Sequence, residues 1–481
     1  MTQNRNNILN TLRIHEVPHG ASRPPGPPGA VSPPVAAPGL GPLGAFMGIW
    51  SGSGFNTIFR PNSAVTPTIL PNSYGTSDNV LELNLTAETL TFSPNLGSVP
   101  NRGSLAGQAD LFLNGIPYVQ SIEDVTIPAS PVGIHFEPGM WLNVGATANP
   151  AAQSGTVVRM GSIPHGVTIQ AQGTSNFING APTIPAVDIT PFTIGQPGAK
   201  NSFPSQTATN TATARIPQTL PATVTQAMLS DPNSVLRAVI STQNIIATTV
   251  LTVSTIPLAP LFGGGTDNIA FLLGNAAGNP ANANAVQMAA TFWIETVKNA
   301  NGSTFQQLQY SQMVLLNFGP LSWPHVSVGT LVQAHPTFAI QAPNQTNFLT
   351  LVNEGGFANG STPIQTNATS VGANEKFTLQ WINQGAGTFA LCTPGGNFLT
   401  VVNGGGVGGP NDASLPIHSD ATTRGPWETL SLVPQFDGTY AIQSATGFYL
   451  TATNGGGVSG SVVSTTATTI GANETLTMNT I

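Results

Sequence analysis

The chain has 481 residues, enough for about three average domains, and only 12 Lys plus Arg and 19 Asp plus Glu. This charged fraction of 6% compares with about 25% in an ordinary soluble protein. With 12 basic residues and a net charge of −7, the chain lacks the basic face that nucleic-acid binding needs. Thr, Asn, Ser and Gln must cover the surface, and these residues favour strands and turns over helices. We therefore expect an all-β protein.

The same composition bears on compartment and assembly. No run of 18 apolar residues occurs, and the N-terminus lacks an apolar signal region, so we expect a soluble, cytoplasmic protein without a membrane span. The single cysteine, Cys392, excludes an internal disulfide framework. A surface with so few charges has little like-charge repulsion, and we expect self-association into a homo-oligomer.

In chain order, residues 1–42 form a Pro-rich arm, and residues 43–334 form a first domain of strands separated by Gly, Pro and Asn turns. Residues 181–223 are rich in Pro, Thr and Asn and predict a long excursion from the sheet. Residues 225–239 predict the domain's helix. The segments with strand periodicity are 80–85, 156–160, 167–173 and, as three consecutive antiparallel strands, 290–297, 306–318 and 325–331.

Residues 335–481 contain an internal repeat. Similar segments begin at Phe338, Phe389 and Tyr440, each 51 residues after the last, and each has an Asn-Gly-rich turn and a later Glu-containing strand. Three copies made of strands and turns predict a β-trefoil, a fold that needs three such units to close its core. The glycines of the turns are explained by positive φ angles better than by ligand binding.

The best candidates for catalytic or metal-ligating residues are three histidines in strand-like segments: His135, His165 and His325. A single such histidine is usually structural. His325 follows Pro324, which fixes the chain ahead of a strand, and its neighbours Val326 and Val328 lie at alternating positions. One neutral imidazole on a rigid strand inside an apolar barrel suits five-coordinate haem iron. No motif for a hydrolase, kinase or glycosidase is present, and the sequence identifies no catalytic residue.

Three segments together resemble the nitrobindin-like haem proteins, small antiparallel barrels related to lipocalins. GIWSGSGF at 48–55 is similar to their opening strand, 133–141 with 157–173 to a pair of later strands, and LSWPHVSVGTL at 321–331 to the terminal strand with the axial histidine. The resemblance implies a lipocalin/nitrobindin-like antiparallel β-barrel that holds haem b. It implies His325 as the iron ligand, and as further cofactor-binding residues Trp50, Phe55, His135, His165 and Trp323.

The same resemblance implies a function. Ferric haem held by His325 would react with a small oxidant such as nitric oxide, peroxynitrite or peroxide, in the manner of a peroxynitrite isomerase or a weak peroxidase. No Asp or Glu lies near His325 in the sequence to give it the anionic character that peroxidases use. The alternative for the barrel is an empty cavity or a carrier of an apolar small molecule.

The repeats resemble fascin-like β-trefoils, in which a hydrophobic-Leu-Thr strand runs into an Asn/Gly turn. The resemblance implies that the core leucines are Leu349, Leu399 and Leu450, and that Glu375, Glu428 and Glu474 cap local turns. The signature of ricin-type lectins is absent. A second hypothesis for the whole chain is a non-enzymatic binding or assembly protein whose trefoil binds a glycan or a protein.

Overall fold

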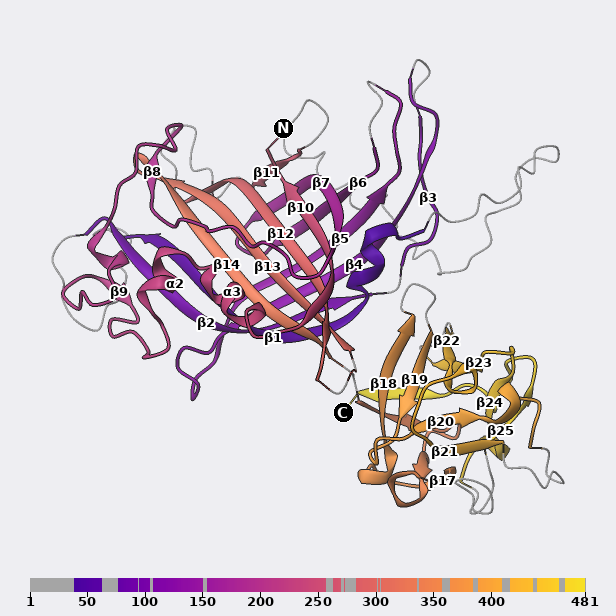
Figure 1. Cartoon of the computed structure of the whole chain (residues 1–481). Coiled ribbons are helices and arrows are strands. Elements are labelled where there is room, and N and C mark those ends of the chain that lie inside the picture. Colours follow the sequence, from indigo (N-terminus) through magenta and orange to yellow (C-terminus); the bar gives the residue numbers. More distant parts are fainter. Residues whose placement is uncertain are drawn as a thin grey trace, which may run out of the picture. The chain divides into compact units, whose positions relative to one another are not determined.

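Both parts of the chain consist mainly of strands, which confirms the all-β class (Figure 1). The described chain divides into two compact units, one up to residue 334 and one from residue 337. The predicted arm at 1–42 lies almost entirely outside the described residues. The computed structural model describes residues 39–480 except 63–76, 94, 104–106, 150–153, 257–262, 270–271, 273–282, 301, 303, 335–336, 357–363, 384–387, 409–415, 436–438 and 458–462.

The first unit is a closed antiparallel barrel, as predicted. In the part of the chain that the structure describes, ten strands pair in the order β1-β2-β4-β5-β6-β7-β10-β12-β13-β14, and β14 pairs with β1 to close the ring. The strands are β1 (Gly48–Pro61), β2 (Asn79–Phe92), β4 (Leu111–Asp124), β5 (Val132–Val144), β6 (Thr156–Ile163), β7 (Val167–Asn179), β10 (Ile245–Ser254), β12 (Asn284–Lys298), β13 (Thr304–Phe318) and β14 (Leu321–Ala334). Short strands pair at the margins: β3 (Val99–Asn101), β8 (Phe192–Thr193), β9 (Arg215–Ile216) and β11 (Gly265–Asn268).

Apolar side chains fill one part of the barrel interior. The 3₁₀ helix η1 (Gly41–Phe46) inserts Phe46, which stacks on Phe92 with ring centroids 4.8 Å apart and contacts Trp141 at 5.2 Å. The Trp50 indole N–H donates to the Phe46 carbonyl at 2.7 Å and ties this helix to β1. The remaining interior, away from this cluster, is free to hold polar groups.

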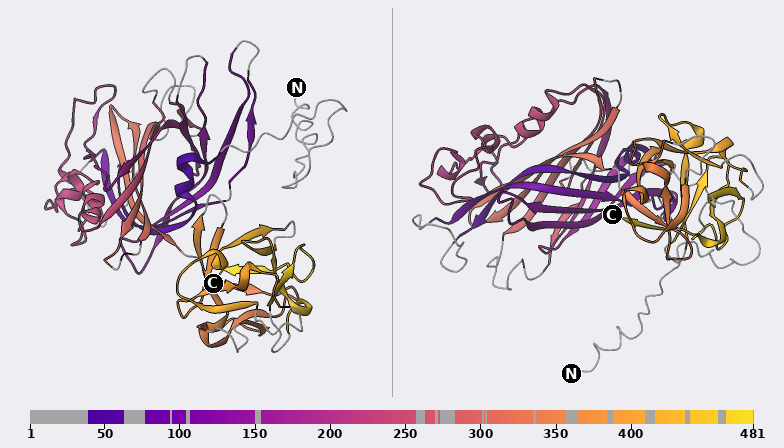
Figure 2. Two further views of the ribbon diagram at one scale, coloured as in Figure 1. Left: turned by 45° about the vertical axis from the view of Figure 1, so that its right-hand side comes forward. Right: turned by 90° about the horizontal axis from the view of Figure 1, so that it is seen from below.

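A second apolar cluster covers the outer face of β1, β2, β12 and β14. Successive residues of a strand face opposite sides, and Phe55, Val326 and Val328 point to this outer face, where the segment between β7 and β10 covers them. The predicted helix at 225–239 is two short helices, α2 (Gln226–Ser230) and α3 (Ser234–Ile240). Pro232 interrupts it because proline has no N–H for the helix ladder. Figure 2 shows both helices outside the strands.

The second unit is the predicted β-trefoil. Its three repeats contribute four strands each, and the last strand, β26, pairs with the first, β15. The strands are β15 (Thr337–Gln341), β16 (Phe348–Leu351), β17 (Ile364–Ala368) and β18 (Lys376–Asn383); β19 (Thr388–Cys392), β20 (Phe398–Val401), β21 (Ile417–Ala421) and β22 (Leu430–Pro434); β23 (Tyr440–Ser444), β24 (Tyr449–Ala452), β25 (Val463–Ala467) and β26 (Thr477–Thr480).

The repeat interfaces explain the Gly-rich turns. In each repeat a turn glycine donates its N–H to a buried carbonyl of another repeat: Gly356 to Ser419, Gly406 to Thr465, and Gly457 to Thr366. These glycines have φ near +80° to +90°, which confirms a structural role. The predicted core leucines are at most 2% exposed, and the predicted capping glutamates accept the N–H groups of Gly372, Gly425 and Gly471. No helix of the described residues has the length and hydropathy of a membrane span.

Candidate functional site

The polar part of the barrel interior is a cavity of about 370 Å³. His325 of β14, His135 of β5 and His165 of the turn between β6 and β7 all line it. Going round the barrel in one direction, β14 is separated from β5 by the three strands β1, β2 and β4. In the other direction five strands lie between them. His325 therefore lies on one wall of the cavity and His135 on the wall across from it. The rings of His135 and His165 are 6.2 Å apart.

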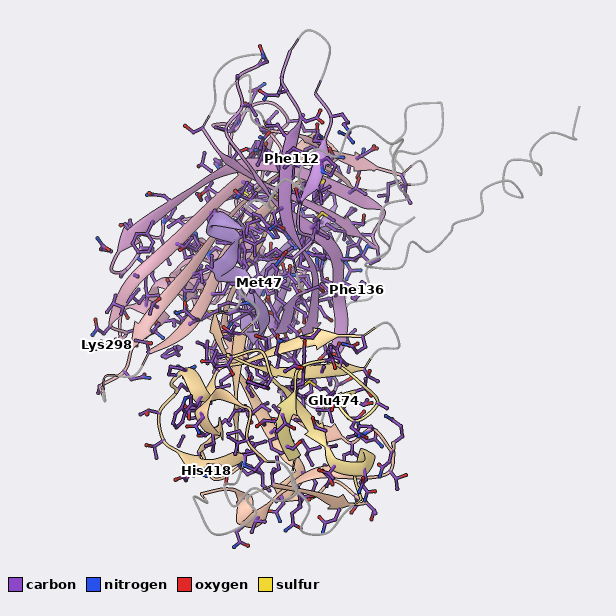
Figure 3. The ribbon with its side chains drawn as sticks, turned by 90° about the vertical axis from the view of Figure 1, so that its right-hand side faces the viewer. Met47, Phe112, Phe136, Lys298, His418 and Glu474 are labelled. Atoms are coloured by element: carbon purple, nitrogen blue, oxygen red, sulfur yellow. The ribbon has the colours of Figure 1, made fainter. Side chains whose placement is uncertain are left out.

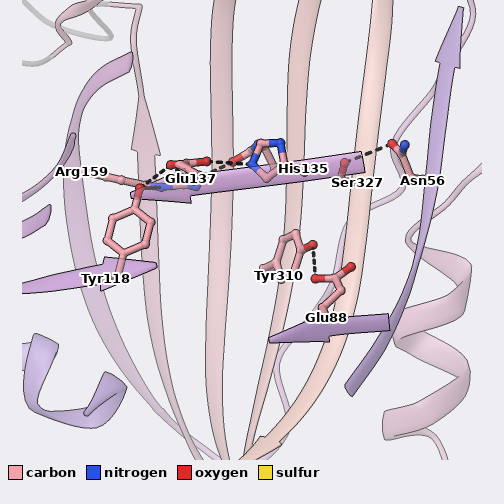
Figure 4. Close-up of polar contacts among 9 residues, drawn as sticks. Asn56, Glu88, Tyr118, His135, Glu137, Arg159, Tyr310 and Ser327 are labelled. Atoms are coloured by element: carbon pink, nitrogen blue, oxygen red, sulfur yellow. Dashed lines mark hydrogen bonds and ion pairs between the residues drawn. The ribbon is translucent and has the colours of Figure 1, made fainter. Parts of the chain in front are cut away.

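His325 is held by an amide from the neighbouring strand. Its Nε2 lies 2.8 Å from the side-chain oxygen of Asn56 on β1, which also accepts the hydroxyl of Ser327 at 3.1 Å (Figure 4). Because an amide oxygen only accepts hydrogen bonds, the Nε2 atom carries the proton and Nδ1 keeps the lone pair. Burial, with smaller contributions from His135 and His165, lowers the pKa of His325 to about 4. The ring is neutral at physiological pH.

Across the cavity, an ion pair holds His135. Glu137 accepts from Arg159 Nη2 at 2.9 Å and from the Tyr118 hydroxyl, while its other oxygen lies 3.2 Å from His135 Nε2. Burial alone would raise the pKa of Glu137, but the Arg159 charge and the bond from His135 outweigh it and lower the pKa to about 2. Glu137 is therefore an anion with its two oxygens directed to different partners.

A second buried carboxyl lies at the border of the cavity and the apolar cluster. Glu88 of β2 accepts the Tyr310 hydroxyl at 2.6 Å and the Thr86 hydroxyl at 2.8 Å. Burial raises the pKa of Glu88 although both hydrogen bonds act to lower it. Glu137 and Glu88 thus have pKa values displaced in opposite directions, one with a cation beside it and one with hydroxyls.

Three of the predicted cofactor-binding residues lie away from the cavity. Trp50 points into the barrel, as predicted, but belongs to the apolar cluster around Phe46. Phe55 is on the outer face, so the prediction that it lines the barrel is wrong: an odd separation of five residues from Trp50 puts the two side chains on opposite sides of a strand. Trp323 stacks on Phe318 with ring centroids 4.4 Å apart, packs on Phe59, and likewise does not line the cavity.

The surroundings of His325 also differ from the expected apolar barrel. Amide, hydroxyl and carboxyl side chains line the cavity together with Ile58, Ile122 and Ile134, and most of the polar residues were missed in the sequence. One sequence signal points to this region: His135, which lines the cavity, alternates with Glu137, which bonds to it from behind the lining. Phe136, between these two residues, is on the outer face and 49% exposed (Figure 3). Asn56 and Glu88 carry no comparable signal.

The donor set suits one axial ligand better than a multidentate metal site. Among the described residues, no group of three or more His, Cys, Asp or Glu is arranged to hold a metal ion. A haem needs one protein ligand with a free lone pair, and metal-ligating histidines usually donate their other ring N–H to an acceptor. His325 has both features, with Asn56 as the acceptor. His325 therefore has the hydrogen-bonding pattern expected of an axial haem ligand.

Comparisons with known proteins give no family. No family model and no curated protein sequence matches the chain. Among solved structures, Rv2717c from M. tuberculosis is 14% identical over 62% of this chain and 99% of its own, with a TM-score of 0.27. The designed threefold symmetric protein ThreeFoil is 19% identical over 30% of this chain and 97% of its own, with a TM-score of 0.26. The Rhizoctonia solani agglutinin is 17% identical over 31% and 96%, with a TM-score of 0.24. At such TM-scores these likenesses carry no inference about function.

Proposed function

We propose that the barrel binds b-type haem in the histidine cavity, with His325 as the axial ligand of ferric iron. The observation that carries the proposal is a buried, neutral imidazole that lines the cavity and whose Nε2–H is bonded to Asn56, so that Nδ1 keeps its lone pair. The cavity volume of about 370 Å³ is within the range of ligand pockets. Arg60, partly exposed at the cavity, pairs with Glu82 at 2.8 Å and would have to share its charge with a haem propionate.

Bound haem would supply an iron centre that reacts with small oxidants such as nitric oxide, peroxynitrite or peroxide. The chain's part is to hold and tune the ligand. Since the partner of His325 is the neutral amide of Asn56 rather than a carboxylate, the ring does not gain the anionic character that favours cleavage of a peroxide bond. This supports a weak peroxidase or a peroxynitrite isomerase over an efficient peroxidase.

Reconstitution of the purified full chain with haemin tests the proposal. We expect a Soret band in the wild type and its loss in His325→Gly, with recovery when free imidazole is added to fill the vacated position. His418→Gly, in the trefoil, is the control for non-specific haem uptake by histidine and should keep the band. A wild type without a Soret band, or an unchanged spectrum in His325→Gly, refutes the assignment.

The alternative occupant of the cavity is an apolar small molecule. Ile58, Ile122 and Ile134 also line the cavity, and the side chains of Asn56 and Asn84 are hydrogen-bonded to each other, so an apolar molecule would not leave them without partners. Native mass spectrometry of the full chain distinguishes the two cases, because a co-purified lipid and a haem differ in mass.

For the trefoil, one observation favours partner binding. Trp427 is 46% exposed and stands where the other two repeats have Asn374 and Asn473. An exposed aromatic side chain at one of three equivalent positions costs solubility and does not serve the shared core, so we propose it as a contact for a glycan or a protein. Binding of the full chain to a glycan array or to captured proteins should be lost in Trp427→Asn, which restores the residue of the other repeats.

A further inference from the structure

His135 and Glu137 are hydrogen-bonded to each other on β5 (Figure 4), and the strand order places β5 across the cavity from His325. A carboxylate only accepts hydrogen bonds, so in the neutral ring the contact at 3.2 Å assigns the proton to His135 Nε2 and leaves the lone pair on Nδ1. The His135 side chain is 17% exposed, and the ring lines the cavity. Glu137 is its one hydrogen-bond partner among the described residues.

Hydrogen bonds hold the Glu137 carboxylate in one orientation. Its first oxygen accepts from both Arg159 and Tyr118, and Arg159 Nε also donates to the Tyr118 hydroxyl at 3.0 Å. The side chains of Glu137 and Arg159 are 0% and 2% exposed. A carboxylate locked on one side by a buried cation presents a fixed second oxygen, and this is the arrangement by which a carboxylate orients a histidine base.

We propose that His135 is the acid–base residue of the cavity, acting on a small protic ligand such as hydrogen peroxide, and that Glu137 is the positioning residue that fixes its tautomer. In the step, an O–H bond of the ligand breaks and an N–H bond forms at Nδ1. The bonding electrons stay on the ligand oxygen, which leaves a hydroperoxide anion and an imidazolium beside the Glu137 carboxylate. The inference rests on the proposed function, because the ligand is one that would react at the haem.

The tautomer can be measured without haem. In the full chain labelled with ¹⁵N-histidine, the NMR signal of His135, assigned by its loss in His135→Gln, should show the Nε2–H form. The double variant Glu137→Leu/Arg159→Met removes the acceptor and the buried cation together, so that no charge is left unpaired. It should increase the Nδ1–H fraction several-fold. A His135 already in the Nδ1–H form, or a tautomer ratio unaffected by the double variant, overturns the positioning role.

The rate measurement uses the haem-reconstituted chain. His135→Gln should lower the second-order rate constant for hydrogen peroxide by about 10² or more, the usual contribution of a general base, while the Soret band stays in place. His165→Gln is the comparison, since its ring lies near by but has no carboxylate partner among the described residues; its effect should be at least tenfold smaller. Equal effects of the two variants, or a Soret shift that makes His135 an iron ligand, overturn the inference. If the wild type takes up no haem, the proposed function fails. The tautomer measurement alone then decides whether Glu137 positions His135.

Discussion

The barrel and the trefoil bury ionisable side chains in different ways. In the trefoil, Glu375, Glu428 and Glu474 occupy the same position of each repeat and each accepts the N–H of a turn glycine. In the barrel, Glu137 and Arg159 form one buried ion pair that also holds His135. A buried charged residue that occupies the same position in all three repeats contributes to the fold of the repeat. A buried charged residue that occurs once and holds a cavity-lining histidine is a candidate functional residue.

The difference also concerns what surrounds each group. The main core of the trefoil is a cluster of apolar side chains, and these three glutamates lie at the turns around it. The barrel interior has an apolar part around Phe46 and a polar part around the histidines. Part of the barrel interior thus contains hydrogen-bonded polar groups in place of packed apolar side chains. Buried polar groups are retained in a protein only where they have hydrogen-bond partners or serve a function.

The largest effect that tests this comparison is expected at the buried ion pair. Glu137→Gln leaves the Arg159 guanidinium buried without its anion, which should cost about 3–5 kcal/mol of barrel stability. Glu428→Gln, in a trefoil turn, keeps an oxygen for the Gly425 N–H and should cost about 1 kcal/mol. Hydrogen exchange measured by mass spectrometry reads the opening free energy of each unit separately in the full chain. Equal losses of stability in the two variants would show that the ion pair contributes no more to stability than a turn cap does.

The sequence predicted the trefoil almost completely because its information repeats. Three copies at a spacing of 51 residues predict the trefoil, and the resemblance to fascin-like trefoils adds the core leucines and the capping glutamates, which the structure confirms. Several barrel strands were predicted from alternation, although β4 and β10 were not. The helix predicted at 225–239 is two short helices, because Pro232 prevents the two segments from joining.

The contents of the cavity could be predicted only in part. His325 meets Asn56 across 269 residues, and Tyr310 meets Glu88 across 222 residues, so only strand order and register bring these side chains together. Local alternation shows which residues share a face but not which face is inside. For that reason Phe55 was placed in the interior although Asn56, its neighbour, is the residue that points there.

Glu295 extends the comparison to a buried carboxyl with neither a cation nor a turn N–H. It accepts from Gln307 at 2.7 Å, its other oxygen has no partner among the described residues, and burial raises its pKa to about 7. The folded state therefore favours the protonated form, so the stability is complete below the unfolded pKa of about 4.5 and decreases as pH rises through 7. Denaturation of the barrel should show a loss of ~2–3 kcal/mol between pH 5 and 9. In Glu295→Gln this loss should disappear; its persistence would assign it to another group.

The smallest effect concerns the trefoil turns and separates backbone conformation from packing between repeats. Gly405 has φ +123°, and a Cβ built there would lie 2.7 Å from Cβ of Phe448 in the next repeat. Gly396 also has a positive φ, +85°, but a Cβ there meets nothing within 4 Å. Gly396→Ala should therefore cost about 1 kcal/mol, from the backbone alone, and Gly405→Ala about 2 kcal/mol, because it also separates two repeats. Thermal denaturation, monitored by hydrogen exchange in residues 440–452, measures the difference in stability between the two variants. Equal costs would mean that the repeats do not depend on this contact, and that the turns owe their glycines to φ alone.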